Sequence, residues 1–161
     1  MHSLSGESMM DERRPYQRIG AISNSHVGND FEGLARLFFD KEGVVLNPRH
    51  KIMIGVGAVK KHKEFDLGCD EQKIIVECKS SRWTESGKSP SAKLSVWTAA
   101  MYYFTLAPAD YRKIMFVLRD THSSKPSTLA AHYLKNHGHL VPPDVEFWEY
   151  DERAGAAERI R

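Results

Sequence analysis

One apolar strand between charged residues constrains the fold of this chain more than any other feature. Residues 73–76 read Lys-Ile-Ile-Val, which is typical of a buried strand. Residues 63–67 can form the antiparallel partner, and residues 68–72 supply a turn. If the turn is centred on Glu71 and Gln72, the numbers of paired residues sum to 143. The segment therefore predicts a β-hairpin of defined register.

This register brings two acidic side chains together. Asp66 is expected directly opposite Glu77, and cross-strand Cβ atoms lie roughly 4.5–5.5 Å apart. Lys79 follows Glu77 by two residues, so it points to the same face. Two close carboxylates repel unless a cation lies between them, and oxygen ligands suit Mg²⁺, Mn²⁺ or Ca²⁺. The pattern predicts a divalent cation site beside a lysine, with a surface hairpin of solvated charges as the alternative.

The acidic pair also carries a family resemblance. Asp66, ten intervening residues and then Glu77-x-Lys79 resemble the motif of the PD-(D/E)xK nuclease superfamily. The proline that precedes the aspartate in that family is replaced here by Phe65. The resemblance covers about residues 28–150, by the order of elements more than by residue identity. It implies a restriction-endonuclease-like fold.

The resemblance also implies roles for individual residues. Asp66 and Glu77 would hold Mg²⁺ or Mn²⁺, with the backbone carbonyl of Cys78 as a further ligand. Lys79 would position the attacking water or stabilise charge on the phosphate. In the family an N-terminal helix often offers a glutamate to the metal, and Glu32 matches that position. The alternative for Glu32 is a first-turn acid favoured by the helix dipole.

Apolar spacing predicts the remaining elements. The first helix follows a cap at Asn29 or Asp30 and ends at Gly43. The later elements are a strand-like stretch at 44–59, a helix at 91–106, a strand at 113–118, a helix at 127–136 and a strand at 145–150. The first three strands can form an antiparallel meander, and the fourth would join through a crossover. We therefore expect an α/β fold with a mixed central sheet flanked by helices and an αβββαβ core.

Length and composition limit the class of protein. A chain of 161 residues fits one domain, expected at 27–152 between a flexible segment at 1–26 and a tail at 153–161 that frays. No apolar run is long enough to span a bilayer, and no signal peptide is recognised. Two cysteines, Cys69 and Cys78, favour a reduced, cytoplasmic protein without a zinc site.

A net charge of +2 is too small to indicate a nucleic-acid binder, so any basic surface must be local. Two basic clusters flank the acidic pair in sequence and form the candidate nucleic-acid surface: Lys60, Lys61 and Lys63 before it, and Arg82, Lys88 and Lys93 after it. Trp83 is expected either to stack on an exposed base or to pack over the sheet edge. The alternative for the basic residues is a solvated surface.

These features together predict a metal-dependent nuclease, with endonucleolytic cleavage of DNA favoured. Three alternatives remain open. The chain can be a non-cleaving DNA-binding module on the same fold. It can be a nuclease subunit of a larger DNA-processing or defence assembly, active as a homodimer or with a partner subunit. It can also be an unrelated α/β protein whose hairpin mimics the motif.

Overall fold

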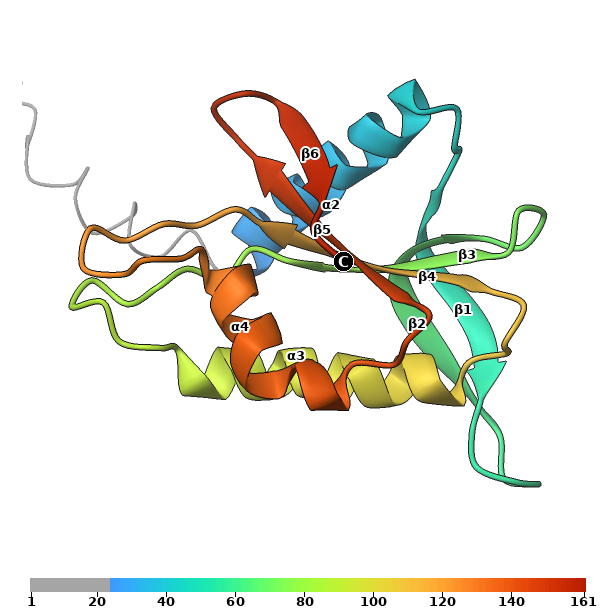
Figure 1. Cartoon of the computed structure of the whole chain (residues 1–161). Coiled ribbons are helices and arrows are strands. Elements are labelled where there is room, and N and C mark those ends of the chain that lie inside the picture. The colour runs from blue at the N-terminus through green and yellow to red at the C-terminus, as the bar shows by residue number, and fades with distance from the viewer. Residues whose placement is uncertain (1–23) are drawn as a thin grey trace, which may run out of the picture.

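A computed structural model describes residues 24–161, which form an α/β fold with one six-stranded mixed sheet and three α-helices (Figure 1). In chain order the elements are α2 (Asn24–Lys41), β1 (Asn47–Ile54), β2 (Lys61–Cys69), β3 (Ile74–Lys79), α3 (Ser91–Leu106), β4 (Arg112–Leu118), α4 (Leu129–His137), a 3₁₀ turn (Gly138–Leu140), β5 (Val145–Asp151) and β6 (Ala156–Arg159). The predicted α/β class is confirmed. Among the described helices, none is long and apolar enough to cross a membrane.

The strands lie in the sheet in the same order as in the chain, β1 to β6. The β1–β2, β2–β3 and β5–β6 pairs are antiparallel, whereas β3–β4 and β4–β5 are parallel. Parallel neighbours need a crossover, and α3 and α4 supply the two that this sheet requires. The predicted meander followed by a crossover is confirmed.

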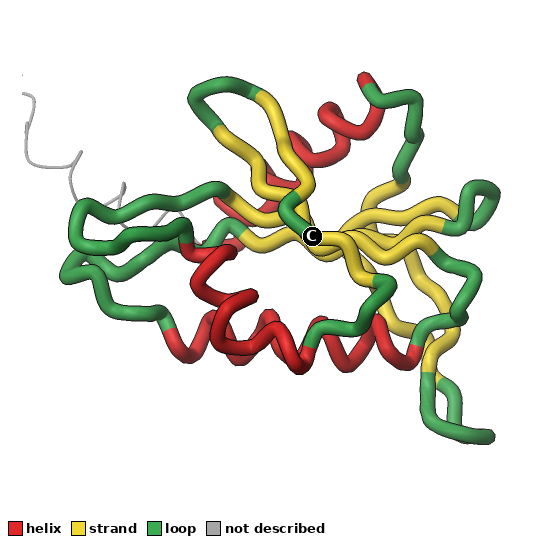
Figure 2. The backbone as a smooth tube through the Cα atoms, viewed as in Figure 1, coloured by secondary structure: helices red, strands yellow, loops and turns green. Residues whose placement is uncertain are grey.

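Helices cover both faces of the sheet, with α2 on one face and α3 and α4 on the other (Figures 1 and 2). Under α2, the side chains of Phe31, Ala35 and Phe39 join a core that includes Phe116 of the sheet. The opposite core contains the apolar face predicted for α3: Leu94, Trp97, Ala100, Met101 and Phe104. The sheet is therefore buried on both sides, as expected for its parallel part.

The register of the β2–β3 hairpin is the one that the sequence predicts. Leu67 pairs with Val76 and Cys69 with Ile74, so the paired numbers sum to 143. The turn closes with a 3.3 Å hydrogen bond from the Lys73 N–H to the Asp70 carbonyl. Apolar residues of alternating strand positions fill both cores, and a slip of one residue would exchange them.

Two expected boundaries are wrong. Helix α2 begins at Asn24, so Asn29 and Asp30 lie inside it rather than capping it. The polar residues before Phe31 lack the apolar periodicity by which a helix is detected. The predicted flexible segment 1–26 lies outside the described residues as far as residue 23.

The tail after Arg153 was expected to fray, but Ala156–Arg159 forms the edge strand β6. An ion pair holds this strand to the sheet, because Nη1 of Arg159 lies 3.2 Å from Oε1 of the buried Glu146 on β5. A four-residue strand without an apolar pattern gives no signal in the sequence.

Trp97 fixes α3 to the sheet, and it provides a test of this packing. Its side chain is fully buried and its indole N–H lies 3.3 Å from the Ser81 hydroxyl. We expect Trp97→Ala to lower the free energy of unfolding by about 3–5 kcal/mol through lost burial and the cavity left behind. The neighbouring Val96→Ala, at a position 53% exposed, should change it by less than about 0.5 kcal/mol. Urea titration of both variants measures the difference, and equal values would contradict this packing role.

Candidate active site

A change of face in β2 positions the first acidic residue. Side chains alternate along a strand, so Phe65 and Leu67 should share one face. Instead, Phe65 packs in the core under α3 and Leu67 in the core under α2. The change occurs at Asp66. The neighbouring strand β1 has a left-handed residue at the same level, Arg49, with a φ of 54°.

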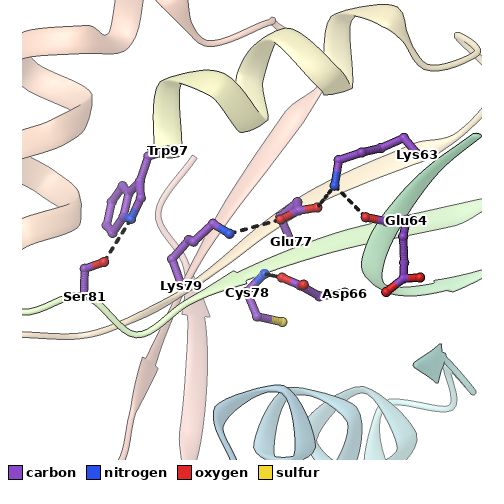
Figure 3. A network of polar contacts seen from close by, with 8 residues as sticks. All are labelled: Lys63, Glu64, Asp66, Glu77, Cys78, Lys79, Ser81 and Trp97. Atoms are coloured by element: carbon purple, nitrogen blue, oxygen red, sulfur yellow. Dashed lines mark hydrogen bonds and ion pairs between the residues drawn. The ribbon is translucent and has the colours of Figure 1, made fainter. Parts of the chain in front are cut away.

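The carboxylate of Asp66 consequently lies between two strands rather than over one face. The paired residues of β2 and β3 end at Leu67 and Val76. Beyond them, Oδ2 of Asp66 accepts a 2.8 Å hydrogen bond from the backbone N–H of Cys78 (Figure 3). The structure thus brings Asp66 to the Glu77–Lys79 end of β3, but the strands do not pair Asp66 directly with Glu77 as the sequence predicts.

Glu77 is buried and shares its two oxygens between two lysines. Lys63 Nζ donates to Oε1 and Lys79 Nζ donates to Oε2, each over 3.1 Å, as Figure 3 shows. Burial and the charge of Asp66 raise the pKa of Glu77, while Lys79 and Lys63 oppose that rise. Burial alone would lower the pKa of Lys79, but Glu77 and Asp66 raise it above its ordinary value. Lys79 is therefore held in its charged form.

Helix α2 adds a third carboxylate. Burial, followed by the charge of Asp66 and a hydrogen bond with its carboxyl group, raises the pKa of Glu32 to about 7. The charge of Glu77 acts in the same direction, and Lys79 opposes it. Glu32 therefore lies close enough to Asp66 and Glu77 for their charges to act on it.

Cys78 places its thiol in the core under α2, where burial raises the thiol pKa well above its ordinary value. Such a thiol stays protonated and is a poor metal ligand. Only the backbone carbonyl of this residue remains as the ligand that the resemblance implies. Both Cys69 and Cys78 are free and buried.

The donor atoms at this site suit a hard divalent cation, because all three side chains are carboxylates. Burial is the largest cause of the raised pKa values of Glu32 and Glu77, and the negative charge of Asp66 adds to it. In this conformation, however, Lys63 and Lys79 neutralise Glu77. Across residues 24–161, no three acidic, histidine or cysteine side chains stand together as a ready metal-binding group. A cation at Asp66 and Glu77 would therefore compete with the two lysines.

The candidate nucleic-acid residues do not form one surface of free charges. Lys63 contacts Glu77, and Lys60 donates to the Gly55 carbonyl over 3.1 Å. Arg82 pairs with Asp120 over 3.2 Å and with Glu152 over 2.8 Å. Lys61, Lys88 and Lys93 are exposed. Four of the six residues, Lys60 included, are exposed and have no acidic partner in the described part of the chain.

Trp83 does not present its ring for base stacking. It is only 6% exposed, and its ring packs 4.8 Å from the ring of His132. Its backbone N–H donates to Asp120 over 2.7 Å, which fixes the loop after β3. Figure 2 shows this loop beside the loop after β4, where His122 contacts the Glu85 carbonyl over 2.9 Å. The packing alternative is the one that the structure supports.

Sequence reasoning missed two features of the site. Lys63 was predicted to belong to the candidate nucleic-acid surface. It lies two residues before Phe65, so its side chain is on the face of β2 that is covered by α3. Tyr103 of α3 was not singled out, but the Lys63 ammonium lies 5.0 Å from its ring centroid. Comparisons of the chain with protein-family models, with curated proteins and with solved structures found no match.

The pKa of Glu32 predicts a pH effect on stability. A carboxyl whose pKa is raised by folding favours the folded state fully below its ordinary pKa, and this contribution is lost as the pH rises through about 7. In metal-free buffer, the free energy of unfolding of Glu32→Gln should therefore rise relative to that of the wild type between pH 5 and pH 8. The expected change is on the order of 1 kcal/mol after solvent screening. Asp40→Asn, at an exposed position on the same helix, should follow the wild type. Urea titrations across this range measure the difference, and parallel curves for Glu32→Gln and wild type would contradict it.

Proposed function

We propose that the chain is a metal-dependent nuclease that hydrolyses phosphodiester bonds in DNA, on a restriction-endonuclease-like core. One observation carries the proposal. Asp66 accepts the N–H of Cys78, so the two acidic residues of the motif meet where β2 and β3 separate, with Lys79 paired to Glu77 beside them.

The order of the elements supports the same function. The described chain runs α2, β1, β2, β3, α3 and β4, with the aspartate on the second strand and Glu77-x-Lys79 on the third. This is the order that the resemblance implies for the αβββαβ core. The fit extends to α2, because its Glu32 is close enough to Asp66 for the charge of Asp66 to help raise the pKa of Glu32.

Asp66, Glu77 and the Cys78 carbonyl would hold Mg²⁺ or Mn²⁺, and Glu32 would complete the set directly or through water. A cation bound there supplies a water of lowered pKa and positive charge for the scissile phosphate. Lys79 is kept charged by its acidic neighbours, so it suits the stabilisation of charge on the phosphate better than proton abstraction.

The charge balance at the site explains why a cation is needed before nucleic acid binds. Three carboxylates face two ammonium groups, a sum of −1 when Glu32 is ionised and 0 when it is neutral. A phosphate has no net attraction to such a site. A divalent cation makes the sum positive, and the local potential then favours the phosphate.

A second candidate is a non-cleaving DNA-binding module on the same fold. One observation favours it, because both oxygens of Glu77 are already paired with lysines. In such a protein the acidic pair would organise basic side chains and not a cation. Cleavage in the presence of Mg²⁺ separates the two functions.

Replacement of Asp66 tests the proposed chemistry. In Asp66→Asn the amide oxygen can still accept the Cys78 N–H, so the fold should persist. Loss of its charge should reduce cleavage of plasmid and linear DNA in Mg²⁺ by on the order of 10²-fold or more. Glu64→Gln, at an exposed position on the same strand, is the control and should cleave like the wild type. Undiminished cleavage by Asp66→Asn would exclude this active site, and DNA binding without cleavage by the wild type would favour the second candidate.

The charge balance predicts that a cation strengthens DNA binding. Ca²⁺, which also takes carboxylate oxygens, should raise the affinity of the wild-type chain for a short DNA by at least about 10-fold, because it adds two positive charges beside the phosphate. Asp66→Asn should lose most of this gain. Fluorescence anisotropy with and without Ca²⁺ at fixed ionic strength measures the effect. An equal gain in both proteins would show that the cation acts elsewhere.

A further inference from the structure

A groove lies between the candidate active site and helix α3. Its volume is about 380 Å³, and it is open to solvent along one side. The sheet contributes charged side chains to it, and the helix contributes small side chains and one aromatic ring. The sheet residues that line it are Lys63, Glu77 and Lys79, and α3 contributes five residues between Ser95 and Tyr103.

Three of these five residues, Ser95, Ala99 and Tyr103, follow one another at intervals of four and lie on one face of α3. Ser95 and Ala99 have short side chains, and they leave the groove open beside Lys79. Tyr103 has a large ring, and it closes the end nearest Lys63. Val96 and Ala100 also line the groove, so the helix wall is mostly apolar and carries one aromatic ring, that of Tyr103.

The ring of Tyr103 is contacted by Lys63. The Lys63 ammonium lies 5.0 Å from the centroid of this ring and 4.9 Å from that of Phe65. The same ammonium donates to Glu77 and to the Glu64 carbonyl. Tyr103 nevertheless remains 39% exposed. A ring that is oriented by a cation and still open to solvent is suited to stacking against another aromatic group.

We propose that this groove binds a single unstacked nucleotide of a single-stranded nucleic acid. Its phosphate would contact Lys63 and Lys79, and its base would stack on Tyr103. The inference rests on the proposed function for the position of the scissile phosphate. It adds that the strand enters along α3 in single-stranded form.

Size and charge favour a single strand over a duplex. The groove has the volume of a small-ligand pocket, in which one base fits but a stacked base pair does not. Duplex binding draws its affinity from many phosphate contacts, whereas this groove offers two ammonium groups. Stacking on an aromatic side chain contributes about 1–3 kcal/mol per base and tolerates any sequence. The groove thus combines few charges with one stacking surface, as single-strand sites do.

Two adjacent tyrosines provide a matched test. Tyr103 lines the groove, whereas Tyr102 is 58% exposed and does not line it. In Ca²⁺, with a labelled oligonucleotide and its duplex compared by anisotropy, Tyr103→Ala should weaken single-strand binding by about 5- to 100-fold, the equivalent of one lost stacking contact. Tyr102→Ala should leave it unchanged, and Tyr103→Phe should restore it. Ala99→Leu, which fills the groove without removing a charge, should weaken it as well.

Equal loss in both alanine variants, no loss in Tyr103→Ala, or absence of single-strand binding by the wild type would overturn the inference. Its failure is distinguishable from failure of the nuclease proposal. If Tyr103→Ala cleaves duplex DNA and binds a single strand as the wild type does, the groove proposal is wrong and the nuclease proposal stands. If single-strand binding depends on Tyr103 but the wild type does not cleave DNA in Mg²⁺, the nuclease proposal is wrong and the groove proposal stands.

Discussion

The hydrogen bond from the Cys78 N–H to the Asp66 carboxylate organises this molecule, because it joins β2 and β3 where their backbone pairing stops. Without an acceptor at this point, a backbone N–H would be left without a partner beside a buried strand. With it, β2 can change face, so that Phe65 packs under α3 and Leu67 under α2. The Asp66 side chain thus accepts a hydrogen bond from a backbone N–H, and its carboxylate lies at the border between the two cores.

The cluster of acidic side chains lowers the stability of the folded chain, because its carboxylates are partly buried and repel each other. Burial and the charge of Asp66 raise the pKa values of Glu32 and Glu77, and Lys79 and Lys63 oppose the rise at Glu77. Replacing such a cluster by apolar residues often leaves stability unchanged or raises it. Groups with perturbed ionisation that converge from a helix and two strands are typical of functional sites, and this convergence supports the proposed function.

The hairpin register and α3 could be predicted because local patterns determine them. The Ile-Ile-Val strand and its turn fix which residues pair, and the helical period of Leu94, Trp97 and Met101 fixes the buried face. The change of face at Asp66 could not be predicted, since Arg49 carries a left-handed conformation that glycine or asparagine would have signalled. Arg82 was misjudged for another reason: its partners, Asp120 and Glu152, lie 38 and 70 residues away in the chain.

Glu77 links the candidate cation site to the groove, because Lys63 contacts both this carboxylate and the ring of Tyr103. If a cation were bound at Glu77, it would weaken the ion pair between Glu77 and Lys63, and the Lys63 ammonium would be available to a phosphate in the groove. Thermodynamic linkage makes this coupling reciprocal: whatever factor the cation adds to the affinity for a strand, the strand adds to the affinity for the cation. In the proposed function, Lys63 would thereby connect cation binding with nucleic-acid binding.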